Sequence, residues 1–326
     1  MKLKSIGIIA YLTLPLAAVP QVAEAWGHLG HQTLATIGSQ LVPHNGLFWS
    51  ANSTTIGVLT NVPDDAWKKG PNVQDEKPNH WFQPDSYYSN SNQFDLFPHA
   101  YKDALQTYSA QTLTTNGTAP WRVRQLYDMA LAALKAGDLV TGLQLAGTMS
   151  HYIGDLSQPL HVTKDYDGQE TGDVGIHKFF ETDNINHANG SQLITDVTAA
   201  TKKLLADPAF TAQFKGTIED VVFAEINRAY AYKDEIIATD RKLGRSGQGA
   251  TTLLALAKPR LSDGAATVAM IFDRLGRESG LANTGVSLSN VAMPAWVAPQ
   301  FEIVSATLND PPQSLTAYLD ADDCDR

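Results

Sequence analysis

Apolar residues recur at the three- and four-residue spacing of a helix face along most of this chain. The clearest run is 121–136, where one side carries Val123, Leu126, Ala130, Ala133 and Leu134 and Gly137 follows as a stop. Similar spacing predicts helices over 31–41, 139–156, 195–206, 218–239 and 253–275, the last broken or kinked near Pro259. Residues 69–100, and the Gly- and Asp-rich 165–175, have the composition of loops. The sequence therefore predicts helices joined by long polar loops.

Composition limits the functions that the chain can perform. The 326 residues include 24 Lys and Arg against 34 Asp and Glu, a net charge of −10, and 43% are hydrophobic, enough for a sizeable core. This acidic balance argues against binding nucleic acid through a basic surface, although a bound metal would change the charge locally. The single cysteine, Cys324, excludes a disulfide scaffold and a Cys-rich zinc site. Any metal must therefore be held by His, Asp and Glu.

The first 25 residues have the pattern of a secretory signal peptide. Two lysines come first, residues 6–19 are mostly apolar, and small residues at 23 and 25 suit a signal peptidase. An uncleaved membrane anchor is the alternative, and Pro15 and Pro20 argue against it. Cleavage between Ala25 and Trp26 would make Trp26 the first residue of a secreted or periplasmic protein.

Side chains suited to metal binding concentrate in His151-Tyr-Ile-Gly-Asp155-Leu-Ser-Gln-Pro-Leu-His161. His151 and Asp155 are four residues apart and share a helix face, and the proline forces a turn that can direct His161 into the same cavity. His177 and Glu181 repeat the four-residue spacing. The alternatives to metal binding are a packing role for the residues from His151 to His161 and a solvent-facing pair without a role for His177 and Glu181.

These motifs resemble those of a known family. The segment from His151 to His161 is similar to the signature of the bacterial zinc-dependent phospholipases C, which share a helical, three-zinc fold with the fungal single-strand-specific nucleases. Three further elements extend the resemblance over about residues 26–275: Trp26-Gly-His-Leu-Gly-His31, which resembles the start of the nucleases, and Pro63-Asp64 and Asn79-His80-Trp-Phe-Gln-Pro-Asp85, which resemble elements of the phospholipases.

The resemblance implies three zinc ions, each with its own ligands. One would bind Asp64, His80, His151 and Asp155; a second His161, His177 and Glu181; a third the Trp26 amine and carbonyl with His31, sharing Asp155 as a bridge. The carboxylates Asp64, Asp155 and Glu181 are the residues assigned to catalysis. Neutral imidazoles and carboxylates suit zinc, and three protein ligands leave a position open for a nucleophile. Asp65 directly follows Asp64, so either could be the ligand.

The resemblance also implies a fold and a division of the chain. We expect an all-α, multi-helix single domain over 26–280, after the signal peptide at 1–25. Residues 281–326 have no counterpart in the family and are expected to form an irregular or β-like extension of unknown role. The aromatic residues of the predicted loop at 69–100, among them Trp81, Phe82, Tyr87, Tyr88 and Phe94, either pack that loop or line a cleft.

Three functions fit these features. The first is a secreted phospholipase C that acts on phospholipid at a membrane surface, as a monomer. The second is a single-strand nuclease or nucleotidase with the same metal core and nucleic acid as its partner, and the third is a non-catalytic zinc-binding protein. The His177-x-x-x-Glu181 pair, the acidic charge and the lack of disulfides favour lipid. The sequence Gln158-Pro-Leu-His161 is more similar to the corresponding motif of the nucleases.

Overall fold

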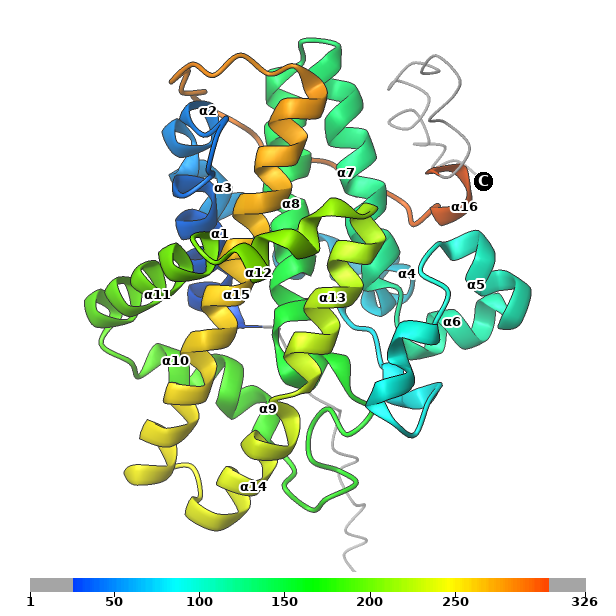
Figure 1. Ribbon diagram of the computed structural model, residues 1–326, viewed down its shortest axis with the longest axis vertical. Coiled ribbons are helices and arrows are strands. Elements are labelled where there is room, and N and C mark those ends of the chain that lie inside the picture. The colour runs from blue at the N-terminus through cyan, green and yellow to red at the C-terminus, as the bar shows by residue number, and fades with distance from the viewer. Residues whose placement is uncertain (1–25, 305–326) are drawn as a thin grey trace, which may run out of the picture.

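The computed structural model describes residues 26–304, so the predicted signal peptide, the cleavage site before Trp26 and Cys324 lie at or beyond its limits. The expected all-α fold is confirmed, since the described residues form helices and no strand (Figure 1). In chain order the elements are α1 (Gly27–Gln40), α2 (Leu47–Ala51), α3 (Ser53–Leu59), η1 (Pro63–Trp67), η2 (Gly70–Asn72), α4 (Val73–Glu76), η3 (Lys77–His80), η4 (Pro84–Ser86), η5 (Ser91–Leu96), α5 (Tyr101–Thr107), α6 (Ala110–Asn116), α7 (Ala119–Lys135), α8 (Leu139–Ser157), η6 (Pro159–Val162), α9 (Ile176–Lys178), η7 (Phe179–Asp183), α10 (Asn184–Asn186), α11 (Gly190–Leu205), α12 (Pro208–Thr211), η8 (Ala212–Lys215), α13 (Ile218–Tyr230), α14 (Lys233–Leu243), α15 (Gln248–Ser279) and α16 (Phe301–Val304).

Helix α8 is the centre of the molecule. Every residue from Leu145 to Ser157 is buried, so this stretch has no solvent-facing side. A helix buried on all sides must be surrounded by others, and α8 packs against α1, α3, α7, α13 and α15. Figure 1 shows it behind α13 and α15, beside α7. The polar side chains of His151 and Asp155 are therefore carried into the interior of the bundle.

The ends of α8 follow from its sequence. Gly137, with φ +80°, turns the chain back after α7. The Asp138 side chain then accepts a hydrogen bond from the Thr141 amide at 3.0 Å and caps the new helix. At the other end Gln158 is extended because it precedes Pro159, which stops the helix as predicted. The chain turns at this point, and the turn brings His161 back toward the core.

Several helix limits differ from the prediction. The helix expected over 218–239 is two helices, α13 and α14, separated at Ala231 and Tyr232, where neither glycine nor proline signals the break. Helix α15 is a single element with Pro259 inside it, and its buried face continues on both sides of the proline, from Leu253 to Leu275. The predicted loop at 69–100 contains short 3-10 and α turns. Helices α2, α3, α5 and α6 were not predicted at all.

After Gly280 the chain forms an extended segment, residues 281–300, that ends in α16. In Figure 1 this orange-to-red trace crosses the bundle from the end of α15 to the side of α7. An irregular or β-like extension was expected here, and its described part is irregular and forms no strand. Its hydrogen bonds include two to the side chain of Asn52. Among the described helices, none combines the length and the apolar character needed to cross a bilayer.

Candidate metal centre

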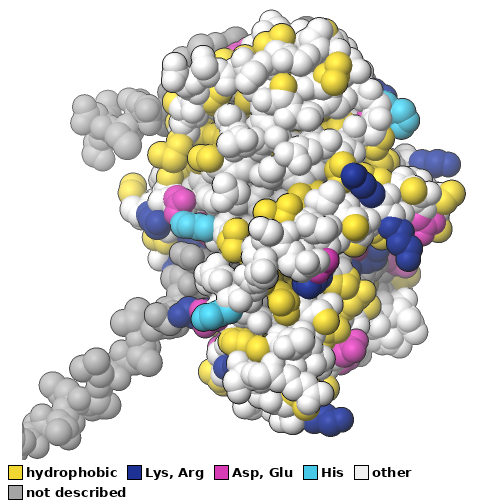
Figure 2. All heavy atoms as spheres, turned by 90° about the vertical axis from the view of Figure 1, so that its left-hand side faces the viewer, with side chains coloured by type: hydrophobic (Ala, Val, Ile, Leu, Met, Phe, Trp, Pro, Cys, Tyr) yellow, Lys and Arg dark blue, Asp and Glu magenta, His cyan; other side chains and the backbone are white. Residues whose placement is uncertain are grey.

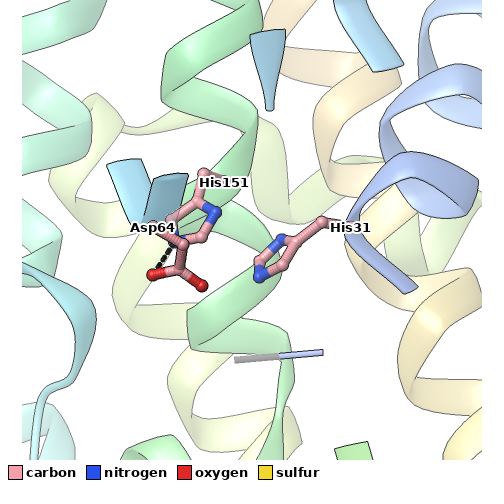
Figure 3. Close-up of side chains that lie close together, drawn as sticks. All are labelled: His31, Asp64 and His151. Carbon is pink, nitrogen blue, oxygen red and sulfur yellow. Dashed lines mark ion pairs between the residues drawn. The ribbon is translucent and has the colours of Figure 1, made fainter. Parts of the chain in front are cut away.

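Four elements bring five of the predicted ligand residues together, here called the first group. His31 comes from α1, Asp64 from the π-helix η1, His80 from the end of η3, and His151 and Asp155 from α8. All five are buried, with at most 3% of each residue exposed. Figure 3 shows His31, Asp64 and His151 pointing toward one another, with the Asp64 carboxylate beside both rings. The structure thus converges these side chains from distant parts of the sequence on one point inside the bundle.

Asp155 lies between two sets of histidines. Its Oδ1 is 3.3 Å from Nε2 of His31. Its Oδ2 is 3.0 Å from Nδ1 of His80 and 3.4 Å from Nε2 of His151. Asp64 completes the group, with Oδ1 3.6 Å from both Nδ1 of His80 and Nε2 of His151. The two oxygens of Asp155 therefore face different ligands, which is the arrangement a bridging carboxylate needs.

The second group is formed by His161, His177 and Glu181. Glu181 Oε2 is 2.8 Å from Nε2 of His177 and 3.4 Å from Nε2 of His161. The Nδ1 atoms of the two rings lie against backbone carbonyls, of His80 for His161 at 2.6 Å and of Tyr166 for His177 at 2.8 Å. A carbonyl acceptor at Nδ1 fixes the proton there and leaves Nε2 as the ligand atom. Both Nε2 atoms are therefore turned toward Glu181.

Gly154 permits the close approach of His31 to α8. A Cβ at this position would lie 2.8 Å from Nδ1 of His31 and 3.0 Å from Leu34, closer than such contacts allow. The His31 ring stacks on the ring of His151 with 4.0 Å between centroids. A glycine one residue before Asp155 is therefore a steric requirement of this group.

The surroundings set the protonation of the first group. Burial, aided by His151, holds the pKa of His31 well below its usual value, and burial does the same for His80. Burial and the neighbouring Asp64 raise the pKa of Asp155 well above its usual range. Burial also opposes ionisation of Asp64, but His151 and a nearby lysine outweigh it and lower the pKa. The rings of His31 and His80 are thus held in the neutral form that binds metals, and Asp155 needs a cation beside it to be a stable carboxylate.

In the second group the acid and the base stabilise each other. Burial opposes the charged form of His177, but Glu181 outweighs it and raises the pKa of the ring. The pKa of Glu181 is lowered despite its burial, because His177 and His161 lie beside it. Burial lowers the pKa of His161. A proton at His177 is therefore the main competitor of a metal ion at this group.

Unsatisfied buried atoms test whether this donor set fits a metal. Both ring nitrogens of His31, Nδ1 of His151, both carboxylate oxygens of Asp155 and Oε1 of Glu181 are buried without a hydrogen bond to any described residue. Buried polar atoms are normally satisfied, and so many exceptions in one place are what a set of metal ligands requires. Three sets of ligand atoms lie close enough for one ion each: His31 with Asp64 and His151, His80 with His151 and Asp155, and His161 with His177 and Glu181. The residues fit the zinc ligand types.

Two predicted residues are placed differently from the rest. Asp65 points away from the group and pairs with His28 at 2.9 Å, with 40% of its side chain exposed, so Asp64 is the carboxylate that the fold brings in. Trp26 is fully buried at the start of α1, where its indole donates a hydrogen bond to Ser157 Oγ at 3.0 Å and its carbonyl accepts one from the Gly30 amide. The role of its main-chain amine as a ligand remains a prediction.

Sequence reasoning missed three neighbours of the centre. Lys68, four residues after Asp64, lies 2.5 Å from its carboxylate with 8% of its side chain exposed. Gln158 donates a hydrogen bond to Glu181 at 3.0 Å. Glu76 lies 3.7 Å from Nε2 of His80 and is fully buried. The sequence signal that could have found Lys68 and Glu76 is their four-residue spacing from the ligands Asp64 and His80.

A cavity of about 470 Å³ lies between the segments 85–89 and 163–171, and none of the predicted metal ligands lines it. Its lining includes Asp85, Tyr88, Lys164 and Lys233, and Lys164 follows His161 by three residues. The aromatic residues of 81–94 divide between the two expected roles. Phe82 and Phe94 are buried in packing contacts, whereas Tyr87 and Tyr88 also line this cavity.

The known proteins that the chain resembles share a low sequence identity with it. No protein-family model matches the chain. A probable serine protease from Bradyrhizobium tropiciagri is 25% identical over 237 residues, which cover 52% of this chain and 30% of the protease. The solved structures to which the structure is similar include two clostridial toxins. One is the alpha toxin from Clostridium absonum, with a TM-score of 0.47, 17% identity and coverage of 77% of this chain and 64% of the toxin. The other is the Clostridium perfringens alpha-toxin from an avian strain, with a TM-score of 0.44, 15% identity and coverage of 80% of this chain and 66% of the toxin. In each case this chain spans less than two thirds of the length of the protein it matches.

Proposed function

We propose that the chain is a secreted zinc-dependent phosphodiesterase that hydrolyses phospholipid as a phospholipase C. The observation that supports this most is the pair of buried ligand groups with Asp155 between His31 and the pair His80 and His151. Imidazoles and carboxylates buried without hydrogen-bond partners are costly to the fold unless an ion satisfies them. Such a cost is retained where the ion has a function.

Each ion has a proposed set of ligands. His80, His151, Asp155 and Asp64 would hold the first, and His161, His177 and Glu181 the second. A third would lie at His31 and Asp155 and take the freed amine and the carbonyl of Trp26. When bound, zinc supplies Lewis acidity for phosphoryl oxygens and allows water to act as a nucleophile at neutral pH.

The residues of the chain orient these ligands and shape the charge of the site. Backbone carbonyls hold the rings of His161 and His177 by their Nδ1 atoms, and Gln158 holds Glu181. The second group provides only three protein ligands, so its coordination leaves room for substrate. Lys68 adds a buried positive charge beside Asp64, because burial alone would lower its pKa but that carboxylate raises it. This charge favours an anionic phosphodiester at the centre.

Lipid is proposed as the substrate over nucleic acid because the chain is acidic and one face of it has no basic stripe. The chain carries a net charge of −10. On the face shown in Figure 2, Lys and Arg side chains are scattered among hydrophobic and uncharged ones and form no stripe. Binding nucleic acid through its backbone needs clustered basic side chains.

The matched serine protease suggests a different chemistry, which the structure allows us to examine. A serine hydrolase needs a serine hydroxyl at a His–Asp pair. Away from the metal centre the described residues form three His–Asp pairs, each with at least one partly exposed partner: His28 with Asp65 at 2.9 Å, His44 with Asp273 at 3.3 Å and His99 with Asp220 at 2.7 Å. None of these histidines has a serine hydroxyl among the hydrogen bonds of the described part of the chain. The protease match therefore does not change the proposal.

A side-by-side assay tests the proposed function. Mature protein beginning at Trp26 is incubated with phosphatidylcholine vesicles, with single-stranded DNA and with casein, each with chelator and after zinc is restored. We expect release of diacylglycerol and phosphocholine that chelator abolishes and zinc restores. Zinc-dependent cleavage of the DNA without lipid turnover would replace the proposal with the nuclease. Chelator-resistant cleavage of casein would overturn it.

A further inference from the structure

Residues 281–298, here called the strap, are fastened across the bundle by hydrogen bonds. In the first half of the strap, the Val286 carbonyl accepts a hydrogen bond from the side-chain amide of Asn52 at 2.8 Å. The Leu288 amide donates one to the side-chain oxygen of Asn52, also at 2.8 Å. Further along, the Pro294 carbonyl accepts a hydrogen bond from the Trp67 indole at 3.2 Å, and the Ala298 carbonyl accepts one from Gln125 at 2.8 Å. A segment without its own helix is thus held at several points.

The second half of the strap reaches a buried carboxylate. The indole of Trp296 donates a hydrogen bond to Glu76 Oε2 at 2.8 Å. Arg122 donates to the same oxygen at 3.0 Å, and the Tyr152 hydroxyl donates to Oε1. Glu76 and Arg122 are both fully buried. A buried ion pair is tolerated only when its remaining hydrogen-bonding positions are filled, and Trp296 fills one of them.

Glu76 in turn lies behind a predicted metal ligand. Its Oε1 is 3.7 Å from Nε2 of His80, while Nδ1 of that ring faces Asp155 at 3.0 Å. Nε2 of His80 is buried without a hydrogen bond to any described residue. A histidine that binds metal through one nitrogen is commonly oriented by a carboxylate at the other. Glu76 has the position of that carboxylate.

The strap contacts the two segments that lead to Asp64 and His80. Trp67, bonded to Pro294, is the last residue of η1, which carries Asp64. Trp67 also packs against Arg122, whose guanidinium lies 5.1 Å from the ring centroid. Pro294 and Trp296 therefore hold the chain on either side of 68–75, between Asp64 and His80.

We propose that the strap is a positioning element of the metal centre: through the Trp296–Glu76 hydrogen bond and the Trp67–Pro294 hydrogen bond it holds His80 and Asp64 in place for the first ion. The segment that follows the helical domain is thereby part of the working enzyme. This inference rests on the metal binding in the proposed function and does not depend on which phosphodiester is cleaved.

Zinc affinity, measured on the full mature chain, tests this role without relying on turnover. Trp296→Phe removes the N–H donor to Glu76 and keeps an aromatic ring. Gln144→Met is the matched control, because Gln144 donates a hydrogen bond of the same length, 2.8 Å, to Ala292 of the same strap but does not touch Glu76. Dissociation constants come from competition with a chromophoric chelator, and melting of the metal-free proteins reports any general loosening.

We expect Trp296→Phe to weaken one zinc by about 10- to 100-fold, the usual effect of removing a residue that orients a ligand, while Gln144→Met stays within about twofold of wild type. Glu76→Gln should weaken the same zinc at least as much. If Glu76→Gln does not fold, the zinc affinity of Trp296→Phe alone tests the role of the strap. Equal affinities in Trp296→Phe and Gln144→Met would overturn the role of the strap alone. Wild-type protein that binds no zinc would overturn the proposed function and this role together.

Discussion

Asp155→Asn should change the stability of the protein in opposite directions with and without metal. The carboxylate faces His31 with one oxygen and His80 and His151 with the other. An amide offers one oxygen and one NH₂ group, so it can serve only one of these sides. The variant should therefore lose the bridge and with it one tightly bound ion.

The size of the effect follows from the linkage of binding to folding. At a free zinc concentration 100-fold above the dissociation constant, one ion stabilises the folded state by about 2.7 kcal/mol. With an unfolding entropy of about 2.1 cal/mol/K per residue, losing that contribution lowers the melting temperature of a chain of about 300 residues by about 4–5 °C.

In the metal-free protein the sign reverses. Burial and Asp64 raise the pKa of Asp155 well above its usual range, so its ionised form destabilises the fold increasingly as the pH rises above the unfolded-state value. Asn removes this cost. At pH 8 with chelator, Asp155→Asn should therefore be at least as stable as wild type, with a gain of up to about 1–3 kcal/mol.

Thermal unfolding of wild type and variant, each at pH 8 with zinc and with chelator, measures both effects, and metal analysis gives the ions retained. The reasoning is refuted if the variant melts well below wild type in chelator, because Asp155 would then be a structural hydrogen-bonding residue. It is also refuted if turnover with zinc stays within about tenfold of wild type, a barrier change of only about 1.4 kcal/mol.

The remaining predictions concern the ligands one at a time. On acidification the ion at His177 should dissociate first, because the pKa of that ring is raised while the pKa of His31 is lowered; metal content after dialysis between pH 7.5 and 5.5 checks the order, and loss of the other ions first would contradict it. Asp64→Asn should reduce zinc content and activity, whereas Asp65→Asn, at a partly exposed site, should change neither; a stronger effect of Asp65→Asn would reverse the assignment. A chain that begins Met-Ala-Trp26 should fold with about one zinc fewer, because an amide nitrogen is a poor ligand; full zinc content would show that Trp26 only packs.

Local patterns were sufficient for the helices with strong signals. Gly137 and Pro159 mark the limits of α8 in the sequence as in the structure, because both constrain the backbone directly. The break between α13 and α14 could not be foreseen, since Ala231 and Tyr232 are compatible with a helix and the turn there depends on tertiary packing. Pro259 lies inside α15 for the same reason, in a helix whose buried face is held by its neighbours.

The candidate site was predictable where ligand types recur at fixed spacing. His151 with Asp155, and His177 with Glu181, are pairs that the helical repeat alone brings together. The choice between Asp64 and Asp65 required the fold, because both follow Pro63 and only the orientation of η1 separates them. Glu76 was missed because its partners, Arg122 and Trp296, are 46 and 220 residues away in the chain.

The central claim is that the buried histidines and carboxylates hold zinc, and metal analysis of the mature protein tests it most directly. Protein processed to begin at Trp26 is purified without chelator and without added metal, and zinc per chain is measured by mass spectrometry. The ligand groups predict three zinc ions per chain. A value below two, in protein shown by its melting transition to be folded, would contradict the trinuclear centre.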